Sequence, residues 1–130
     1  MSQSGGDTTA PQQDVAATAE DEPNQLISAE DAKELLDSGT ALVLLDVRTA
    51  EEYATSHLSG AYLLPESEIS TRAELELNDK SLPILVYCQS GARSASASAQ
   101  LVALGYKNVL DIGGLEGWPY EEYLVSEENV

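Results

Sequence analysis

The chain has 130 residues, among them 23 acidic and six basic side chains, and its formal charge is −17. This excess of acid argues against binding to nucleic acid or to an anionic membrane surface, because both require a basic protein surface. The longest apolar stretches fall far short of the roughly 20 residues of a transmembrane helix. We therefore expect one domain without a membrane-spanning segment, present as a monomer.

Residues 1–25 differ in composition from the rest of the chain. They contain no Lys, Arg or aromatic residue, and so little apolar surface cannot offset the entropy cost of ordering the chain. We predict a disordered acidic and polar tail over residues 1–25, a domain over residues 26–125 and a flexible C-terminus over residues 126–130. The tail lacks the features of a signal peptide but resembles the polar spacer of bacterial lipoproteins, so a cytoplasmic and an exported, envelope-anchored location both stay open.

A helix and a strand are predicted directly after the tail. Ser28 and Asp31 have the pattern of a helix N-terminus, and Gly39 marks the end of that helix. Residues 41–47 then form an apolar run that is typical of a strand buried on both faces.

The next helix is expected to begin at a capping box. Thr49 and Glu52 have the required spacing, so Arg48 falls in the turn between strand and helix. Residues 61–64 predict a short strand, and residues 69–77 predict a short helix. Ligands of open α/β sheets bind at the carboxyl ends of the strands, which is where Arg48 would lie.

The remaining chain continues this alternation. Residues 83–87 form a short apolar strand bounded by turn signals, residues 94–104 predict a helix, and residues 109–112 predict a last strand. Alternating strands and helices are typical of an α/β fold with a parallel sheet.

The strongest chemical signal is the loop that follows the strand at residues 83–87. The only cysteine, Cys88, lies where the apolar strand meets a short loop that contains Gly91 and Arg93 and leads into a helix. The amide groups and dipole at a helix N-terminus favour an anion, so they would stabilise a thiolate and bind an anionic substrate group. Gly91 gives the loop the freedom to turn its amides inward.

A lone cysteine at the end of an apolar strand is also typical of an ordinary core residue. A core cysteine requires neither the polar residues that follow Cys88 nor an arginine five positions later, whereas an anion site requires both donors and positive charge. We therefore favour a nucleophile, with the Ser90 and Ser94 hydroxyls as possible additional donors. The loop is expected to comprise Gln89, Ser90, Gly91, Ala92, Arg93 and Ser94.

Four motifs in register along residues 26–123 resemble those of single-domain rhodaneses, a family of sulfurtransferases. The motifs are Cys88-x-x-Gly91-x-Arg93-Ser94, Asp46-Val47-Arg48 with Glu51-Glu52-Tyr53, His57-Leu58-Ser59-Gly60-Ala61, and Gly113-Gly114-Leu115-Glu116-Gly117-Trp118. The resemblance implies a rhodanese-like α/β fold with a central, mostly parallel five-stranded sheet and helices on both faces. It also implies that Cys88 takes a sulfane sulfur from a small donor such as thiosulfate, becomes a persulfide and passes the sulfur to cyanide, a thiol or a protein acceptor. No metal or organic cofactor is expected.

Two other functions stay open. The related phosphatases and arsenate reductases carry a loop one residue longer, so the four residues between Cys88 and Arg93 disfavour a phosphatase. A non-catalytic or sensory rhodanese module that binds a protein partner or carries persulfide is the closer alternative. The intact Cys88 disfavours its inert form.

The two arginines of these motifs have alternative roles. Arg93, at the end of the loop, is expected to brace the loop or to contact the bound anion. Arg48 either reaches a substrate anion or pairs with a nearby acid such as Glu52.

Three further residues are interpreted as structural. The resemblance suggests that Asp46 forms hydrogen bonds to loop amides and that His57 lies in a structural turn, although histidine is the usual general base near neutral pH. Trp118 is expected to pack beside the site, with substrate contact as the alternative.

Overall fold

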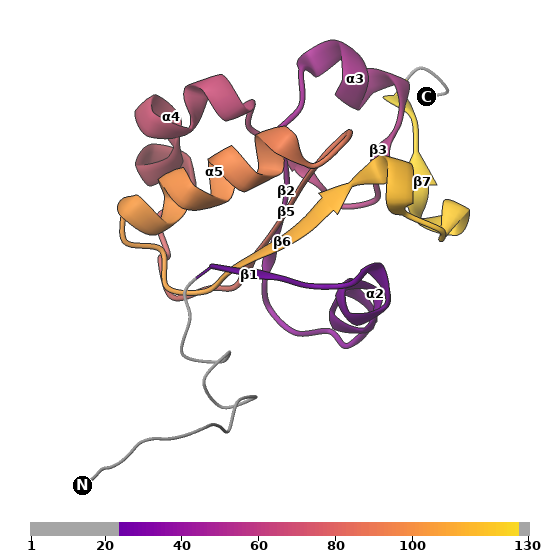
Figure 1. Cartoon of the computed structure of the whole chain (residues 1–130), viewed down its shortest axis with the longest axis horizontal. Helices are drawn as coiled ribbons and strands as arrows, with labels where there is room; N and C mark the ends of the chain where they lie inside the picture. The colour runs from indigo at the N-terminus through magenta and orange to yellow at the C-terminus, as the bar shows by residue number, and fades with distance from the viewer. Residues whose placement is uncertain (1–23, 128–130) are drawn as a thin grey trace, which may run out of the picture.

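The computed structural model describes residues 24–127 and contains a central sheet in which every neighbouring pair of strands is parallel (Figure 1). Parallel strands require crossover connections, and the alternation of strands and helices in the sequence supplies them. The predicted five-stranded α/β fold is confirmed. In spatial order the strands are β1 (Asn24–Leu26), β6 (Val109–Gly114), β5 (Ile84–Cys88), β2 (Val43–Asp46) and β4 (Tyr62–Leu63).

Helices cover both faces of the sheet. Helices α4 and α5 lie side by side on one face, and α2 lies on the other (Figure 1). The helices are α2 (Ala29–Asp37), α3 (Ala50–Thr55), α4 (Ile69–Glu76) and α5 (Ala92–Ala103), with short 3-10 turns η2 (Glu66–Glu68), η3 (Leu115–Gly117) and η4 (Glu121–Tyr123). A small antiparallel pair joins β3 (His57–Leu58) to β7 (Leu124–Val125).

Two apolar cores result from this layering. One packs Leu45 and Val86 of the sheet against Ala97 and Leu101 of α5, and the other packs Leu85 and its neighbours against α2 and the C-terminal turns. All five residues of β5 are buried because the strand is central and covered on both sides. The strand that ends in Cys88 is therefore held on all sides by packed structure.

Local signals in the sequence fix the N-termini of three helices. The Ser28 side chain accepts a hydrogen bond from the Asp31 amide at 3.0 Å, and Thr49 and Glu52 form a complete capping box. Helix α5 begins at Ala92, two residues earlier than predicted, because Gly91 adopts a φ of 110° and ends the loop there.

The predicted tail boundary requires a correction at its end. Asn24 and Gln25, which we assigned to the disordered tail, form β1 together with Leu26 and pair with β6. The prediction of disorder for residues 1–23, and that of flexibility for residues 128–130, lie outside the described residues. No helix between residues 24 and 127 has both the length and the apolar character needed to cross a membrane.

Candidate active site

Cys88 is the last residue of the central strand and lies at the carboxyl edge of the sheet. Its side chain is fully buried, and the Gly91 amide donates a hydrogen bond to Sγ at 2.9 Å. The chain reverses direction between the two residues because Gly91 has a positive φ, which an L-residue rarely adopts. The loop thus curls back so that one of its own amides contacts the sulfur.

Helix α5 starts directly behind this loop. Its first i to i−4 hydrogen bond runs from the Ala95 amide to the Gly91 carbonyl oxygen at 3.1 Å, so the amides of Ala92, Arg93 and Ser94 precede the helical bonding pattern. Such amides at a helix N-terminus favour an anion at the loop. The Ser94 hydroxyl donates to the Gly91 carbonyl at 3.0 Å and so supports the loop rather than the sulfur.

The end of strand β6 and the turn η3 that follows it contact the first peptide of the loop. The Glu116 amide donates to the Gln89 carbonyl oxygen at 3.1 Å, and a Cβ on Gly114 would lie only 2.3 Å from that oxygen. Gly114 pairs with Cys88 after a register shift next to Val86, which brings the two backbones into this close approach. Gly114 and Glu116 both belong to the last of the four sequence motifs, which we took to lie near the site, and Gly114 is part of β6 rather than of a turn.

Arg48 is buried and fixes the same loop residue from the other side. It forms a two-pronged ion pair with Asp46, with Nη2 to Oδ2 at 2.8 Å and Nε to Oδ1 at 3.0 Å, and its Nη1 donates to Oε1 of Gln89 at 3.2 Å. Nη2 also donates to the Ser56 carbonyl. The ion-pair partner of Arg48 is therefore Asp46, not Glu52.

Asp46 connects this ion pair to the central strand. Besides the guanidinium it accepts hydrogen bonds from the Arg48 amide at 2.9 Å and from the Tyr87 hydroxyl at 2.7 Å, and that hydroxyl accepts one from the Leu58 amide. Burial and the neighbouring carboxylate raise the pKa of Tyr87. Our sequence interpretation missed Tyr87 because a tyrosine within an apolar strand looks like an ordinary core residue.

Arg93 points to the first turn of α3. Its two terminal nitrogens donate to the two carboxylate oxygens of Glu52 at 2.9 and 3.1 Å. The hydrogen bonds from Arg93, together with those from Thr49, lower the pKa of Glu52 from 4.5 to about 2. Of the two roles expected for Arg93, the structure shows the contacts of the brace.

His57 lies in β3, and its ring contacts Tyr53 of α3. The ring stacks on Tyr53 with centroids 3.7 Å apart, and Nδ1 donates to the Tyr53 carbonyl oxygen at 2.7 Å. Within residues 24–127 no hydrogen bond joins His57 to Cys88. The hydrogen bond and the ring contact of its side chain are both with α3, and the structural role that we expected for His57 stays a prediction.

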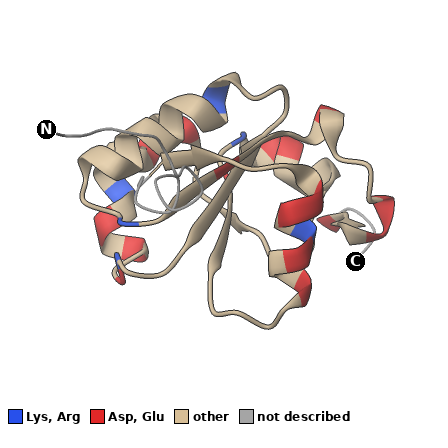
Figure 2. Ribbon diagram, turned by 60° about the horizontal axis from the view of Figure 1, so that its bottom comes forward, with Lys and Arg blue, Asp and Glu red and all other residues tan. Residues whose placement is uncertain are grey.

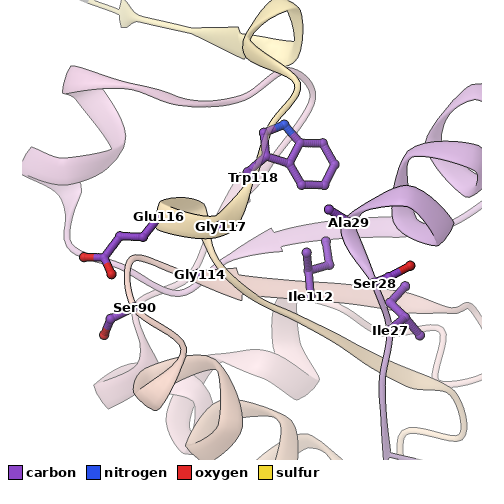
Figure 3. A pocket seen from close by; sticks show the side chains of 9 residues that line it. All are labelled: Ile27, Ser28, Ala29, Ser90, Ile112, Gly114, Glu116, Gly117 and Trp118. Atoms are coloured by element: carbon purple, nitrogen blue, oxygen red, sulfur yellow. The ribbon is translucent and has the colours of Figure 1, made fainter.

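Trp118 packs in the second apolar core and lines a cavity of about 430 Å³ (Figure 3). Its side chain is largely buried, and the indole nitrogen donates to the Tyr120 carbonyl at 3.0 Å. Ser90 of the loop and Glu116 line the same cavity. Trp118 is thus a wall of a space that adjoins the active loop.

Comparisons with known proteins show which proteins this chain is similar to. Residues 28–121 match the family described as Rhodanese-like domain. The chain is 37% identical over 114 residues to thiosulfate sulfurtransferase 18 of Arabidopsis thaliana, an alignment that covers 78% of this chain and 82% of the plant protein. A solved structure described as rhodanese with anions from E. coli superposes with a TM-score of 0.59 at 33% identity, covering 66% of this chain and 99% of that one.

Some relatives are considerably longer than this chain. The chain is 38% identical over 94 residues to YrkF of Bacillus subtilis, whose name describes a sulfur carrier protein. That alignment covers 71% of this chain but only 49% of YrkF. The chain spans 24% of MoeZ of Mycobacterium tuberculosis, whose name combines adenylyltransferase and sulfurtransferase, at 33% identity and 71% coverage of this chain.

Proposed function

The chain belongs to the rhodanese-like domain family, and on that basis we propose that it moves sulfane sulfur from a donor such as thiosulfate to a thiophilic acceptor through a persulfide on Cys88. The relatives whose names include thiosulfate sulfurtransferase support a transferase of this family. The single observation that carries the proposal is the hydrogen bond from the Gly91 amide to the Cys88 sulfur at the N-terminus of α5.

The reaction divides into two displacements at sulfur. The Cys88 thiolate attacks the sulfane sulfur of thiosulfate, a new S–S bond forms, and the donor S–S bond breaks so that sulfite leaves with the bonding electron pair. Cyanide then attacks the outer sulfur of the persulfide, thiocyanate forms, and the thiolate of Cys88 is restored. Neither step requires a metal or an organic cofactor.

The residues around Cys88 support these steps by holding the loop. Sγ is shielded from bulk water, so a fixed amide dipole acts on the thiolate and on the persulfide more strongly than it would in solvent. Arg48 fixes the Gln89 side chain, and Arg93 ties the start of α5 to Glu52. A preorganised loop of this kind need not rearrange as charge moves between the two sulfur atoms.

A persulfide carrier that delivers sulfur to a protein acceptor is the second candidate. It is favoured by the similarity to YrkF, whose name describes a sulfur carrier. The two functions share the loading of Cys88 and differ in the acceptor. A phosphatase is disfavoured, because only four residues separate Cys88 from Arg93.

Turnover by Cys88→Ser tests the proposal. A serine hydroxyl is hardly ionised at neutral pH and cannot store sulfane sulfur, so this variant is expected to form no thiocyanate from thiosulfate and cyanide. His57→Asn is the control, because its contacts lie in β3 and α3, and it is expected to retain most of the turnover. Retained turnover in folded, purified Cys88→Ser would contradict the mechanism.

A further inference from the structure

Both arginines beside the active loop are already paired with carboxylates. Arg48 is bound by Asp46 and is only 3% exposed, and Arg93 is bound through both terminal nitrogens by Glu52. Neither side chain therefore presents an unpaired positive charge to a ligand at Cys88. The uncharged loop side chains at positions 89, 90 and 92 add none.

The described part of the chain includes all six basic residues. The four besides Arg48 and Arg93 lie elsewhere in the structure. Three of the four are in ion pairs on or next to α2 and α4. Lys107 precedes β6 and so lies at the amino end of the parallel strands, opposite the edge that carries Cys88. The four residues are Lys33, Arg72, Lys80 and Lys107.

Two further carboxylates line cavities that residues of the loop also line. Glu116 lines the cavity that Ser90 also lines, and Figure 3 shows both side chains at one end of it. Glu66 lines a second cavity together with Arg93. The side chains around the site therefore sum to a negative charge, and the only uncompensated positive potential comes from the amides of the loop and of α5.

We propose that the donor this site uses best is an organic persulfide, R–S–SH, whose carbon group R is uncharged or cationic, rather than dianionic thiosulfate. The inference rests on the proposed function and specifies its donor. The Cys88 thiolate attacks the terminal sulfur of R–S–SH, the Cys88 S–S bond forms, and the donor S–S bond breaks so that RS⁻ leaves with the electron pair. The proton stays on the transferred sulfur, and no external oxidant or reductant takes part.

The preference follows from the cost of removing charge from water. A dianion loses more hydration energy than a monoanion or a neutral group when it enters a partly buried site, and here no free side-chain cation compensates the loss. The partial charge at a helix N-terminus is about half an elementary charge, which suits one sulfur anion better than two charges. A cationic group R would also be attracted to the Glu116 carboxylate.

Persulfides with one reacting group and different charges on R test the proposal in the unmodified protein. Suitable donors are the persulfides of cysteamine, 2-mercaptoethanol and 3-mercaptopropionate, with R cationic, neutral and anionic, each compared with thiosulfate. For each donor, the rate of sulfur transfer to Cys88 is divided by the rate at which the same donor transfers sulfur to a free small thiol in solution. The normalised rate is expected to fall in that order, with thiosulfate lowest and about tenfold or more below the cationic persulfide.

The second test of the proposal removes the carboxylate that pairs with Arg93. Glu52→Gln weakens the ion pair and exposes the guanidinium charge, so the rate with thiosulfate relative to the neutral persulfide is expected to rise about fivefold. Glu51→Gln is the matched control, since it removes the same charge one residue away on an exposed position of α3. In the control the ratio is expected to stay within about twofold, because distant surface charge is screened.

The outcomes separate this inference from the proposed function. Loading of Cys88 with the anionic persulfide or thiosulfate fastest, or an equal ratio in Glu52→Gln and Glu51→Gln, would overturn the donor preference and leave sulfur transfer intact. Absence of a persulfide on Cys88 with all four donors would overturn both.

Discussion

Glu52 joins two structures that are far apart in the sequence. Its carboxylate completes the capping box of α3 by accepting from the Thr49 amide at 3.0 Å, and it also binds both terminal nitrogens of Arg93 at the start of α5. One side chain thus sets the first turn of one helix and restrains the loop before another. Glu52 therefore holds the start of α5 to α3, besides its role in helix capping.

The ion pair of Glu52 makes part of the stability depend on pH. The pKa of Glu52 falls from 4.5 to about 2 in the folded protein, with the Arg93 hydrogen bonds as the main cause. A depressed carboxyl pKa contributes stability that is fully present above about 4.5 and is lost as the pH falls toward 2. We expect the free energy of unfolding of the unmodified protein, relative to Glu52→Gln, to decline by about 1 kcal/mol or less over this range, because the pair is one-third exposed.

Denaturant unfolding of both proteins between about pH 6 and 3 measures this difference. Glu51→Gln serves as the control, because its carboxylate lies one position away and Arg93 binds its neighbour. A difference between the unmodified protein and Glu52→Gln that stays constant over the range would contradict the assigned pKa shift.

At the scale of elements, the close approach of β6 to the active loop depends on one glycine. A Cβ at position 114 would lie 2.3 Å from the Gln89 carbonyl oxygen and 2.8 Å from the Ser90 carbonyl carbon, and both are backbone atoms that cannot rotate away. Gly114→Ala is therefore expected to displace the loop, to lower kcat/KM at least tenfold and to destabilise the fold by about 1–3 kcal/mol.

Gly117→Ala provides the matched control for this prediction. A Cβ at position 117 would meet no atom within 4 Å, and the residue follows Gly114 in the same motif. Turnover and thermal unfolding of the two variants are measured side by side. Equal activity in both would show that the loop does not depend on the backbone approach at position 114.

The elements that sequence reasoning predicted are those with local signals. Ser28 caps α2, Thr49 caps α3, and the apolar run before Cys88 forms the central strand, because capping groups and hydrophobic periodicity act within a few residues. Strands β1, β3 and β7 were missed. They are two or three residues long, too short for a periodic pattern, and they form only through long-range pairing.

In the site, too, the features with local signals could be predicted and those that depend on long-range contacts could not. The position of Cys88 at the end of a strand, just before a loop that leads into a helix, followed from the strand, the loop glycine and the helix pattern. The partner of Arg48 could not be predicted in this way. The sequence suggested Glu52 or a substrate anion, and only the packed arrangement brings the guanidinium between Asp46 and Gln89. The network through Tyr87 likewise spans 41 positions of the chain.

At the scale of the whole molecule, a formal charge of −17 opposes an anionic donor. Acidic residues lie on several helices around the molecule, whereas basic residues are few and scattered (Figure 2). The screening length shrinks from about 30 Å at 0.01 M salt to about 8 Å at 0.15 M, so salt weakens the repulsion by distant carboxylates more than contacts inside the partly buried site. We expect kcat/KM for thiosulfate to rise over this interval and to rise less for an uncharged donor.

Steady-state kinetics in a salt whose anion does not compete for the loop measures the effect. A steady fall of kcat/KM for thiosulfate with salt would mean that attraction by a local positive field outweighs the global charge. That result would contradict the inference that the carboxylate partners of Arg48 and Arg93 compensate their positive charges at the site.

The central claim is that Cys88 holds the transferred sulfur covalently. Intact-mass measurement followed by peptide mapping, after exposure to a sulfane-sulfur donor and removal of the excess donor, tests it without assuming an acceptor. The account predicts a mass gain of one sulfur atom on the peptide containing Cys88, which disappears when cyanide or a thiol is added and is absent in Cys88→Ser. An unchanged mass after exposure to thiosulfate and to organic persulfides, in a protein shown to be folded, would contradict it.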